Sequence, residues 1–298
     1  MLMIGPPGAG KSMLAQRLPS ILPPLAPREL LEVSMIASIA GELADGKLSD
    51  RRPFRAPHHS ASMAAIVGGG LKARPGEASL AHHGVLFLDE LPEFSPQVLD
   101  SLRQPLETAE CVIARANHRI SYPARIQLVA AMNPCRCGMA GEPGHRCLRG
   151  PRCQSDYQAR ISGPLLDRID LRIEVPAVTA GELVGAARAE GSAAIAQRVA
   201  RARALQHKRY TALGLPGWTT NAACSAALIE DIVPLEADGM ALIRDASEKL
   251  GFSARAYHRV LKVARTLADL DGGDRVTRIH LAEAISYRMA GDRAARAA

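Results

Sequence analysis

The sequence is poor in aromatic residues: Phe, Trp and Tyr together make up 3% of its 298 residues. Its hydrophobic cores must therefore be built mainly from Ala, Leu, Ile and Val. No apolar run approaches the roughly 18 to 20 residues that are needed to cross a bilayer. The short apolar start also does not resemble a secretory signal. We therefore expect a cytoplasmic protein that does not enter a membrane.

Acidic residues are in deficit. The chain has 37 Lys and Arg against 30 Asp and Glu, which gives a formal net charge of +7. This excess is compatible with an anionic polymer such as DNA as a partner. Nucleotide handling and a codon bias toward arginine would also explain it, so the charge alone leaves the partner open.

The most informative motif lies at the start of the chain. The segment after the apolar Met1–Ile4 satisfies the phosphate-loop pattern G-x-x-x-x-G-K-[ST]. The residues expected to bind nucleotide here are Gly5, Pro6, Pro7, Gly8, Ala9, Gly10, Lys11, Ser12 and Met13. The glycines allow close approach of the backbone to phosphate oxygens, Lys11 is expected to reach the β and γ phosphates, and Ser12 to bind Mg²⁺. The motif predicts an ATPase that uses ATP and Mg²⁺; a glycine-rich turn before a helix is the alternative.

Two other predicted strands end in polar residues. Val85–Leu88 is followed by Asp89 and Glu90, and Ile126–Met132 is followed by Asn133. Functional residues of parallel sheets gather at the carboxyl ends of the strands. We expect Asp89 to hold Mg²⁺, Glu90 to polarise the attacking water, and Asn133 to position that water or to sense the γ-phosphate. A solvated acidic turn is the alternative for the two acids.

The alternation of short apolar runs with helical segments predicts an α/β fold. Leu2–Ile4, Val85–Leu88, Ile126–Met132 and Leu171–Val175 fit a parallel sheet. We expect a three-layer nucleotide-binding domain over residues 1–177. Residues 178–298 are rich in Ala and Arg at helical spacing, with breaks at Leu215–Gly217 and Asp271–Gly273, and predict a separate all-helical domain.

Two helices of this second domain have a predicted inner face. Along Ser253–Leu270 the apolar stripe is Tyr257, Val260, Leu261, Ala264, Leu267 and Leu270, and the polar face is Arg255, Arg259, Lys262 and Arg265. Along Thr277–Arg288 we expect Ile279, Ala282 and Ile285 to point inward. The single tryptophan, Trp218, is expected to anchor packing rather than to stack on a base.

Four of the six cysteines are clustered in a loop over residues 135–153. They are Cys135, Cys137, Cys147 and Cys153, in the pattern C-x-C-x9-C-x5-C. Four thiolates form a closed tetrahedral site for structural zinc, with His145 as a substitute for one ligand. Reduced thiols on a loop are the alternative. The adjacent pairs His58-His59 and His82-His83 are expected to be structural or substrate-loop residues, because neighbouring residues rarely point at one ion.

Six ordered segments together resemble the Mg-chelatase-like AAA+ ATPases of the ComM/YifB family, over essentially the whole chain. They are Gly5–Ser12, Arg52–His59, Gly84–Phe94, Ala131–Cys135, Ser162–Asp170 and Phe252–Arg259. The resemblance implies a P-loop AAA+ core with a helical lid, assembled as a hexameric homo-oligomer. In that family Lys11 and Ser12 would belong to Walker A, Asp89 and Glu90 to Walker B, and Asn133 would be sensor 1.

The same resemblance implies roles for three arginines. Arg168 matches the arginine finger that acts on a neighbouring subunit, Arg160 could share that work, and Arg255 matches sensor 2 of the lid. Residues 109–124 would form the presensor hairpin. Its candidate contacts with a polymer are Arg115, His118 and Arg119. The alternative is that these residues are ordinary exposed charges of a hairpin.

The activity implied by the resemblance is ATP-driven work on DNA, namely branch migration in recombination or natural transformation. The ATPase subunit of magnesium chelatase shares the fold and is the first alternative. Family members normally carry a Lon-like domain and an adenine-gripping segment before the phosphate loop, which this sequence does not contain. We therefore expect a truncated chain that binds ATP weakly, and an inactive nucleotide-binding module is the second alternative.

Overall fold

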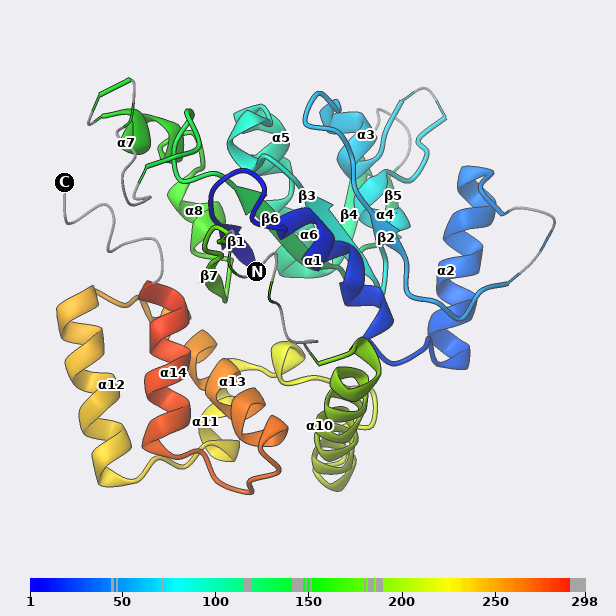
Figure 1. Cartoon of the computed structure of the whole chain (residues 1–298). Coiled ribbons are helices and arrows are strands. Elements are labelled where there is room, and N and C mark those ends of the chain that lie inside the picture. Colours follow the sequence, from blue (N-terminus) through cyan, green and yellow to red (C-terminus); the bar gives the residue numbers. More distant parts are fainter. Residues whose placement is uncertain are drawn as a thin grey trace. The chain divides into compact units, whose positions relative to one another are not determined.

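The computed structural model describes residues 1–289 apart from 44–45, 47, 71, 115–118, 141–146, 148, 151, 180, 182–184 and 186–189. The chain divides into two compact units (Figure 1). In the described part of the chain, the first consists of Met1–Ile169 and Ile173–Ala189, and the second of Asp170–Arg172 and the residues from Glu190 to Met289.

A five-stranded sheet lies at the centre of the first unit. Its strands are β1 (Leu2–Ile4), β2 (Phe54–Arg55), β3 (Val85–Leu88), β6 (Gln127–Met132) and β7 (Arg172–Glu174), in the order β2-β3-β6-β1-β7. The pairs β2–β3, β3–β6 and β6–β1 are parallel. Leu88 lies opposite Ala130 and Ile4 opposite Met132, so the carboxyl ends of β3, β6 and β1 lie side by side. The predicted parallel sheet is confirmed.

Side chains of the sheet alternate between two hydrophobic cores, as the twofold period of a strand requires. One core takes Leu86, Leu88 and Met132 and is closed by α3 (Met63–Val67), α4 (Glu77–Leu80), α5 (Pro96–Ser101) and α8 (Gly163–Leu166). The other takes Val85 and Phe87 and is closed by α1 (Lys11–Arg17) and the 3₁₀ helix η1 (Leu18–Ser20). Helices therefore cover both faces, which confirms the three-layer core.

The other elements of this unit surround the sheet. They are α2 (Pro27–Ala40), η3 (Leu91–Glu93), α6 (Arg103–Thr108), β4 (Glu110–Ala114), β5 (Arg119–Pro123) and α7 (Cys153–Gln158). Strands β4 and β5 form an antiparallel hairpin with Cys111 opposite Tyr122 and Ala114 opposite Arg119. This confirms the predicted hairpin strands. Arg119 is exposed, whereas Arg115 and His118 lie outside the described residues.

The second unit is helical between Glu190 and Met289, apart from the connecting turns. Its elements are α10 (Ser192–Ala212), η4 (Asn221–Ala223), α11 (Ala226–Ile232), α12 (Ala237–Leu250), α13 (Ala254–Leu270) and α14 (Arg278–Met289). Helix α13 packs against α10, α11 and α14, and Ser253 caps it by accepting a hydrogen bond from the Ala256 amide. Trp218 packs against this core beside Tyr210, as expected of an anchor. None of the helices in the described ranges has the length and apolarity to cross a membrane.

The predicted face of α13 is wrong at two positions. Leu270 is 42% exposed, whereas Arg265 is only 1% exposed. Burial of Arg265 is possible because its guanidinium pairs with Asp269 one turn later and donates to the carbonyls of Gly273 and Asp274. The prediction that Arg265 lies on the exposed polar face is therefore wrong. Its partners include carbonyls of the turn that follows the helix, and the helical pattern does not show where that turn lies.

The predicted face of α14 is also shifted. Ile279 is 76% exposed and Ala282 is exposed, whereas Leu281, Ala284 and Ile285 are buried. Only Ile285 of the predicted set points inward. The sequence offers two apolar stripes on this short helix, and packing against α12 and α13 selects the one that contains Leu281.

Candidate nucleotide-binding site

The glycine loop begins where β1 leaves the sheet, between β6 and the residue that follows β7. The Gly5 amide donates to the Met132 carbonyl at 3.2 Å, and the Val175 amide donates to the Ile4 carbonyl at 2.7 Å. A Cβ atom on Gly5 would lie 2.0 Å from the Val175 carbonyl oxygen. Glycine is required here because the two backbones touch.

Lys11 is held at the base of the loop. It follows Gly10, whose φ of 83° starts α1 in a left-handed conformation. The Lys11 ammonium donates to the carbonyls of Gly5 and Pro6 at 2.8 Å each and to Asn133 Oδ1 at 3.2 Å. Burial lowers the pKa of Lys11, and the Asp89 carboxylate opposes that shift. The structure therefore brings Lys11 and Asn133 together, as the sequence predicts.

Ser12 and the two acids after β3 form the other side of the site. Ser12 Oγ donates to Asp89 Oδ2 at 2.5 Å, and the Glu90 amide donates to Asp89 Oδ1 at 2.9 Å. Glu90 has a φ of 52°, a left-handed conformation that is costly for a residue with a side chain. Residues held in such conformations cluster at functional sites.

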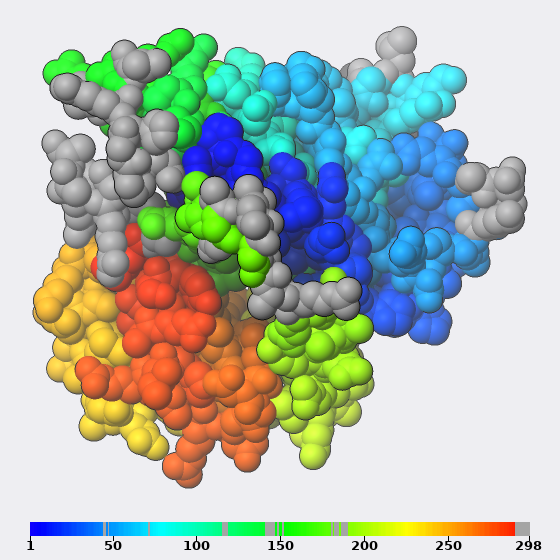
Figure 2. Space-filling model, viewed as in Figure 1, coloured from blue at the N-terminus to red at the C-terminus, as the bar shows by residue number. Residues whose placement is uncertain are grey.

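These groups line one pocket of about 360 Å³. Its walls are Pro7, Gly8, Ala9, Gly10, Lys11, Ser12, Met13, Asp89, Glu90, Met132 and Asn133. In Figure 2 the dark-blue segment that contains the glycine loop and α1 is exposed on the viewed face. The pocket has backbone amides and an ammonium for phosphates, and a hydroxyl beside a carboxylate, the oxygen ligands that Mg²⁺ prefers. The residues present therefore fit a nucleoside triphosphate with Mg²⁺.

One contact at the edge of the site was not predicted from the sequence. His59 Nδ1 lies 3.4 Å from Glu90 Oε2, and the structural or substrate-loop role expected of His59 stays a prediction. Its ring also contacts Phe94 edge-on, with centroids 6.4 Å apart. The sequence signal that could have predicted the contact with Glu90 is the position of His59 shortly after β2. Strand β2 is the parallel neighbour of β3, and the carboxyl ends of adjacent parallel strands meet at one edge of the sheet.

The two candidate finger arginines lie in different surroundings. The Arg168 side chain is 5% exposed, pairs with Glu107 and donates to the Pro164 carbonyl at 2.7 Å. The Arg160 side chain is 39% exposed and donates to Glu93 at 3.0 Å. Arg255, an exposed residue, lies in the first turn of α13 in the second unit. The roles of all three remain predictions.

The remaining candidate ligands form two groups. The sulfur atoms of Cys135, Cys137, Cys147 and Cys153 all lie within 4.8 Å of one another, as the zinc hypothesis requires, whereas His145 lies outside the described residues. His82 and His83 both contact Glu32 Oε2, at 3.1 and 2.8 Å. Glu32, His82 and His83 thus also form a group with ligand atoms within 4.8 Å of one another, and the structural or substrate-loop role predicted for the His82-His83 pair stays a prediction.

The chain matches known families over both units. Residues 1–183 match the family described as "Magnesium chelatase, subunit ChlI". Residues 189–288 match "Magnesium chelatase, subunit ChlI C-terminal".

Individual relatives agree with this match. The chain is 47% identical over 289 residues to the competence protein ComM of Haemophilus influenzae, with 97% of this chain and 55% of ComM covered. It is 46% identical over 289 residues to YifB of Escherichia coli, with the same coverage of 97% and 55%. It is 28% identical over 149 residues to the magnesium-chelatase 38 kDa subunit of Rhodobacter capsulatus, with 45% of this chain and 43% of that subunit covered.

The chain spans about half the length of the curated relatives it matches, 55% for both ComM and YifB. The parallel sheet, the glycine loop with its acids, and the helical second unit agree with the family that both matches name. The chain therefore belongs to the magnesium chelatase ChlI family of AAA+-type ATPases, and its sequence is more similar to ComM and YifB than to the Rhodobacter chelatase subunit.

Proposed function

We propose that this chain is the ATP-hydrolysing motor of a AAA+ ring. The observation that carries the proposal is the convergence of Lys11, Ser12, Asp89, Glu90 and Asn133 on one pocket from three adjacent strand ends. A glycine-rich turn without function would not need two acids and an amide at the ends of two neighbouring strands. Each of these groups has a distinct task in phosphoryl transfer to water.

The tasks follow from the chemistry of each side chain. Lys11 donates hydrogen bonds to phosphate oxygens, and the buried site strengthens that interaction. The Glu90 carboxylate, the more exposed of the two acids, accepts a proton from the attacking water. Asn133, already within 3.2 Å of the Lys11 ammonium, orients that water through its amide. Mg²⁺, when bound by Ser12 and Asp89, neutralises charge on the phosphates.

Two substitutions test this assignment. Lys11→Ala should abolish hydrolysis and weaken nucleotide binding, whereas Glu90→Gln should lower the hydrolysis rate by at least about 100-fold with binding retained. Phosphate release and the binding of a fluorescent ATP analogue measure the two effects. Glu110→Gln, at an exposed position of β4, is the matched control and should behave like the wild type. Hydrolysis that survives Glu90→Gln refutes the role of Glu90.

Ring assembly is the second part of the proposal, because AAA+ proteins typically oligomerise. An arginine from one subunit would then complete the site of the next, and Arg168 and Arg160 are the candidates. Arg168→Ala should abolish hydrolysis without preventing nucleotide binding, and Arg160→Ala should have a smaller effect. Addition of Lys11→Ala subunits, whose arginines are intact, should restore part of the hydrolysis by Arg168→Ala subunits. Failure of that rescue while both variants co-assemble would contradict action between subunits.

The position of Arg255 at the start of α13 supports a role as the lid arginine. Arg255→Ala should weaken nucleotide binding, and Arg244→Ala is a control at another exposed position of the second unit. Equal effects of the two substitutions would refute a specific role.

DNA is the proposed substrate of the motor, through branch migration during recombination or natural transformation. Support comes from the net charge of +7 and from the identity of 47% to a relative named as a competence protein. Single-stranded or branched DNA should stimulate hydrolysis, and removal of the exposed charge of Arg119 should reduce the stimulation. A motor that acts on DNA implies a cytoplasmic location, which cell fractionation tests.

A chelatase-type ATPase subunit is the second candidate, favoured by the family description of both matched segments. In that case DNA would have no effect, and hydrolysis would respond to the partner subunits of a magnesium chelatase. An inactive nucleotide-binding module is the third candidate. It would remain monomeric and hydrolyse no ATP with or without DNA.

A further inference from the structure

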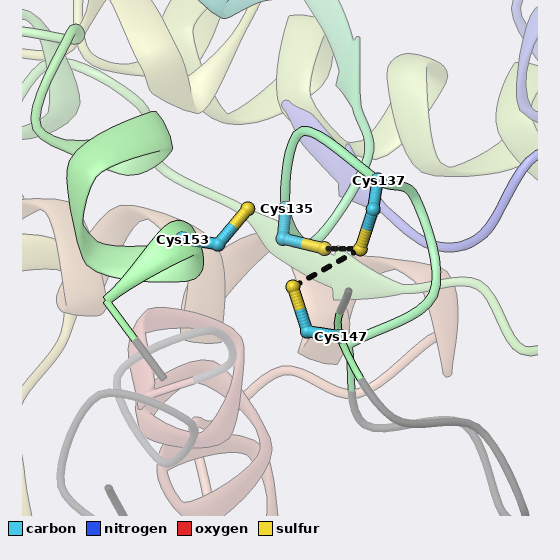
Figure 3. A group of neighbouring side chains, drawn as sticks. All are labelled: Cys135, Cys137, Cys147 and Cys153. Atoms are coloured by element: carbon cyan, nitrogen blue, oxygen red, sulfur yellow. Dashed lines mark hydrogen bonds between the residues drawn. The ribbon is translucent and has the colours of Figure 1, made fainter. Parts of the chain in front are cut away.

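The cysteine cluster brings three separate segments of the chain to one point (Figure 3). Cys135 and Cys137 follow β6 by a few residues, Cys147 lies further along the loop, and Cys153 begins α7. The sulfur atoms of Cys135 and Cys137 are 2.9 Å apart, and those of Cys137 and Cys147 are 3.2 Å apart. All four sulfur atoms lie within 4.8 Å of one another.

The grouping of four sulfur atoms suits a metal ion better than the alternatives, and a tetrahedral ion would need the pairs at 2.9 and 3.2 Å to separate by less than about 1 Å. A disulfide needs a sulfur–sulfur distance of about 2.05 Å, and none of the four cysteines is in a disulfide. Four sulfurs around a zinc ion, each about 2.3 Å from it, lie about 3.8 Å from one another. Thiols are weak hydrogen-bonding groups, so hydrogen bonds among them give little reason for four to gather. Cys135 and Cys153 are moreover buried.

The backbone around the cluster is folded into tight turns. The Gly138 amide donates to the Cys135 carbonyl at 2.9 Å, and the Cys153 amide donates to the Gly150 carbonyl at 3.3 Å. Gly138 and Gly150 have φ values of 86° and 85°. Such turns allow cysteines close in sequence to direct their sulfurs to one side.

The charge near the cluster is positive. The exposed residues Arg136, Arg149 and Arg152 lie within two positions of a clustered cysteine. A zinc ion with four thiolates carries a net negative charge, so nearby arginines favour it. A soft, all-sulfur ligand set selects zinc over the oxygen-preferring Mg²⁺ and Ca²⁺.

We propose that Cys135, Cys137, Cys147 and Cys153 bind a structural zinc ion that holds the outer wall of the nucleotide pocket in place. The turn from Cys135 to Gly138 packs directly on the glycine loop, because a Cβ atom on Gly138 would lie 2.7 Å from Pro7 Cγ. The consequence for nucleotide binding rests on the proposed function, whereas the zinc site does not.

A second contact links the far end of the loop to the same wall. Gln158, at the end of α7, donates through Nε2 to the Pro134 carbonyl at 3.3 Å. Pro134 directly follows Asn133, a residue of the pocket. Zinc would therefore link the residues after β6 to α7. That link would fix the position of the turn that packs on Pro7 and of Pro134, which directly follows Asn133.

Metal content of the purified chain is the first test. Mass spectrometry of the metals should find about one zinc per chain after purification without added metal, and Cys147→Ser should remove most of it. Cys224→Ser, a buried cysteine outside the cluster, is the matched control and should retain the zinc. Less than about half an equivalent in the wild type, iron in place of zinc, or full retention in Cys147→Ser overturns the site. If Cys147→Ser does not fold, release of zinc by a mercurial reagent from the wild type, in step with modification of four thiols, replaces it.

Two glycine substitutions test the link to the pocket. Gly138→Ala and Gly150→Ala impose the same backbone strain, but a Cβ atom meets Pro7 only at position 138 and open space at position 150. With zinc retained in both, Gly138→Ala should weaken binding of a fluorescent ATP analogue at least about fivefold more than Gly150→Ala. Equal affinities overturn the link to the pocket. A full equivalent of zinc in a chain that binds no nucleotide would refute the proposed function and leave the zinc site standing.

Discussion

The buried histidine His82 makes the stability of the first unit depend on pH. Its side chain is 1% exposed. Its Nδ1 accepts a hydrogen bond from the Arg125 amide at 3.0 Å, so the ring proton is on Nε2, which faces Glu32 at 3.1 Å. Protonation of Nδ1 would place its N–H against the N–H of Arg125 and break the hydrogen bond between them. The folded protein therefore holds His82 neutral.

The magnitude follows from the pKa of His82. Burial lowers this pKa from 6.5 to about 4, against the opposing effect of the hydrogen bond with Glu32. The neighbouring His83 and Arg125 contribute to this lowering. Between these two values the unfolded chain binds a proton that the folded chain does not, so stability rises with pH and is lost as the pH falls. The full contribution is about 3 kcal/mol, of which about 2 kcal/mol is lost at pH 5.

Glu32 acts in a separate, lower window. Hydrogen bonds, first from His83 and then from His82, lower its pKa from 4.5 to about 2. A carboxylate with a lowered pKa contributes stability above its ordinary pKa and loses it as the pH falls toward the folded value. Its loss begins near pH 4.5, so a comparison between pH 7 and pH 5 reports on His82.

Urea unfolding at pH 7 and pH 5, followed by far-ultraviolet circular dichroism, measures this effect. The wild type should lose about 2 kcal/mol more than His82→Gln between the two pH values. His207→Gln, an exposed histidine in the second unit, should behave like the wild type. Fluorescence of Trp218 reports the second unit separately and should be the same in wild type and His82→Gln. An equal loss of stability in wild type and His82→Gln refutes the assignment of a neutral, buried His82.

Three further predictions concern the glycine loop, the proposed catalytic residue Glu90 and the core of the second unit. Gly5→Ala places a Cβ atom 2.0 Å from a backbone carbonyl oxygen and should cost at least about 2 kcal/mol in urea unfolding; a neutral result would contradict the close approach. His59→Ala removes the contact at 3.4 Å from Glu90 and should lower the kcat of ATP hydrolysis by roughly 10- to 100-fold, whereas a change confined to KM would argue against a positioning role. Asp269→Asn, at a side chain with no exposure that pairs with two arginines, should destabilise the second unit by about 3 to 5 kcal/mol, as measured by tryptophan fluorescence.

Much of the sheet could be predicted because β1, β3 and β6 are short, apolar and mostly buried. Leu2–Ile4 and Val85–Leu88 are β1 and β3 as predicted, and β6 starts one residue later than expected. The two-residue β2, Phe54–Arg55, has no such signal. A segment of that length has no period to detect, and only pairing with β3 makes it a strand.

In the helical second unit, the spacing of apolar residues predicts some buried positions and fails at others. On α13 the central positions Val260, Leu261 and Ala264 are buried as predicted, because a strong apolar stripe leaves no alternative. The error at Ile279 arises because packing against α12 and α13 decides which face of α14 is buried. The error at Arg265 arises because an arginine can be internal when carbonyls and a carboxylate surround it, and the spacing of apolar residues does not show how the chain turns after the helix.

Some residues of the nucleotide site could likewise be predicted from the sequence, and others could not. Lys11, Asp89 and Asn133 could be predicted because each follows a recognisable apolar strand, and parallel pairing then fixes their proximity. His59 could not, because it follows the strand that the sequence does not reveal. If the contact between His59 and Glu90 controls the orientation of the proposed catalytic carboxylate, then β2, the strand with the weakest sequence signal, helps to position it. The positive φ of Glu90, 52°, and its contact at 3.4 Å with His59 then belong to one arrangement at the ends of two neighbouring strands.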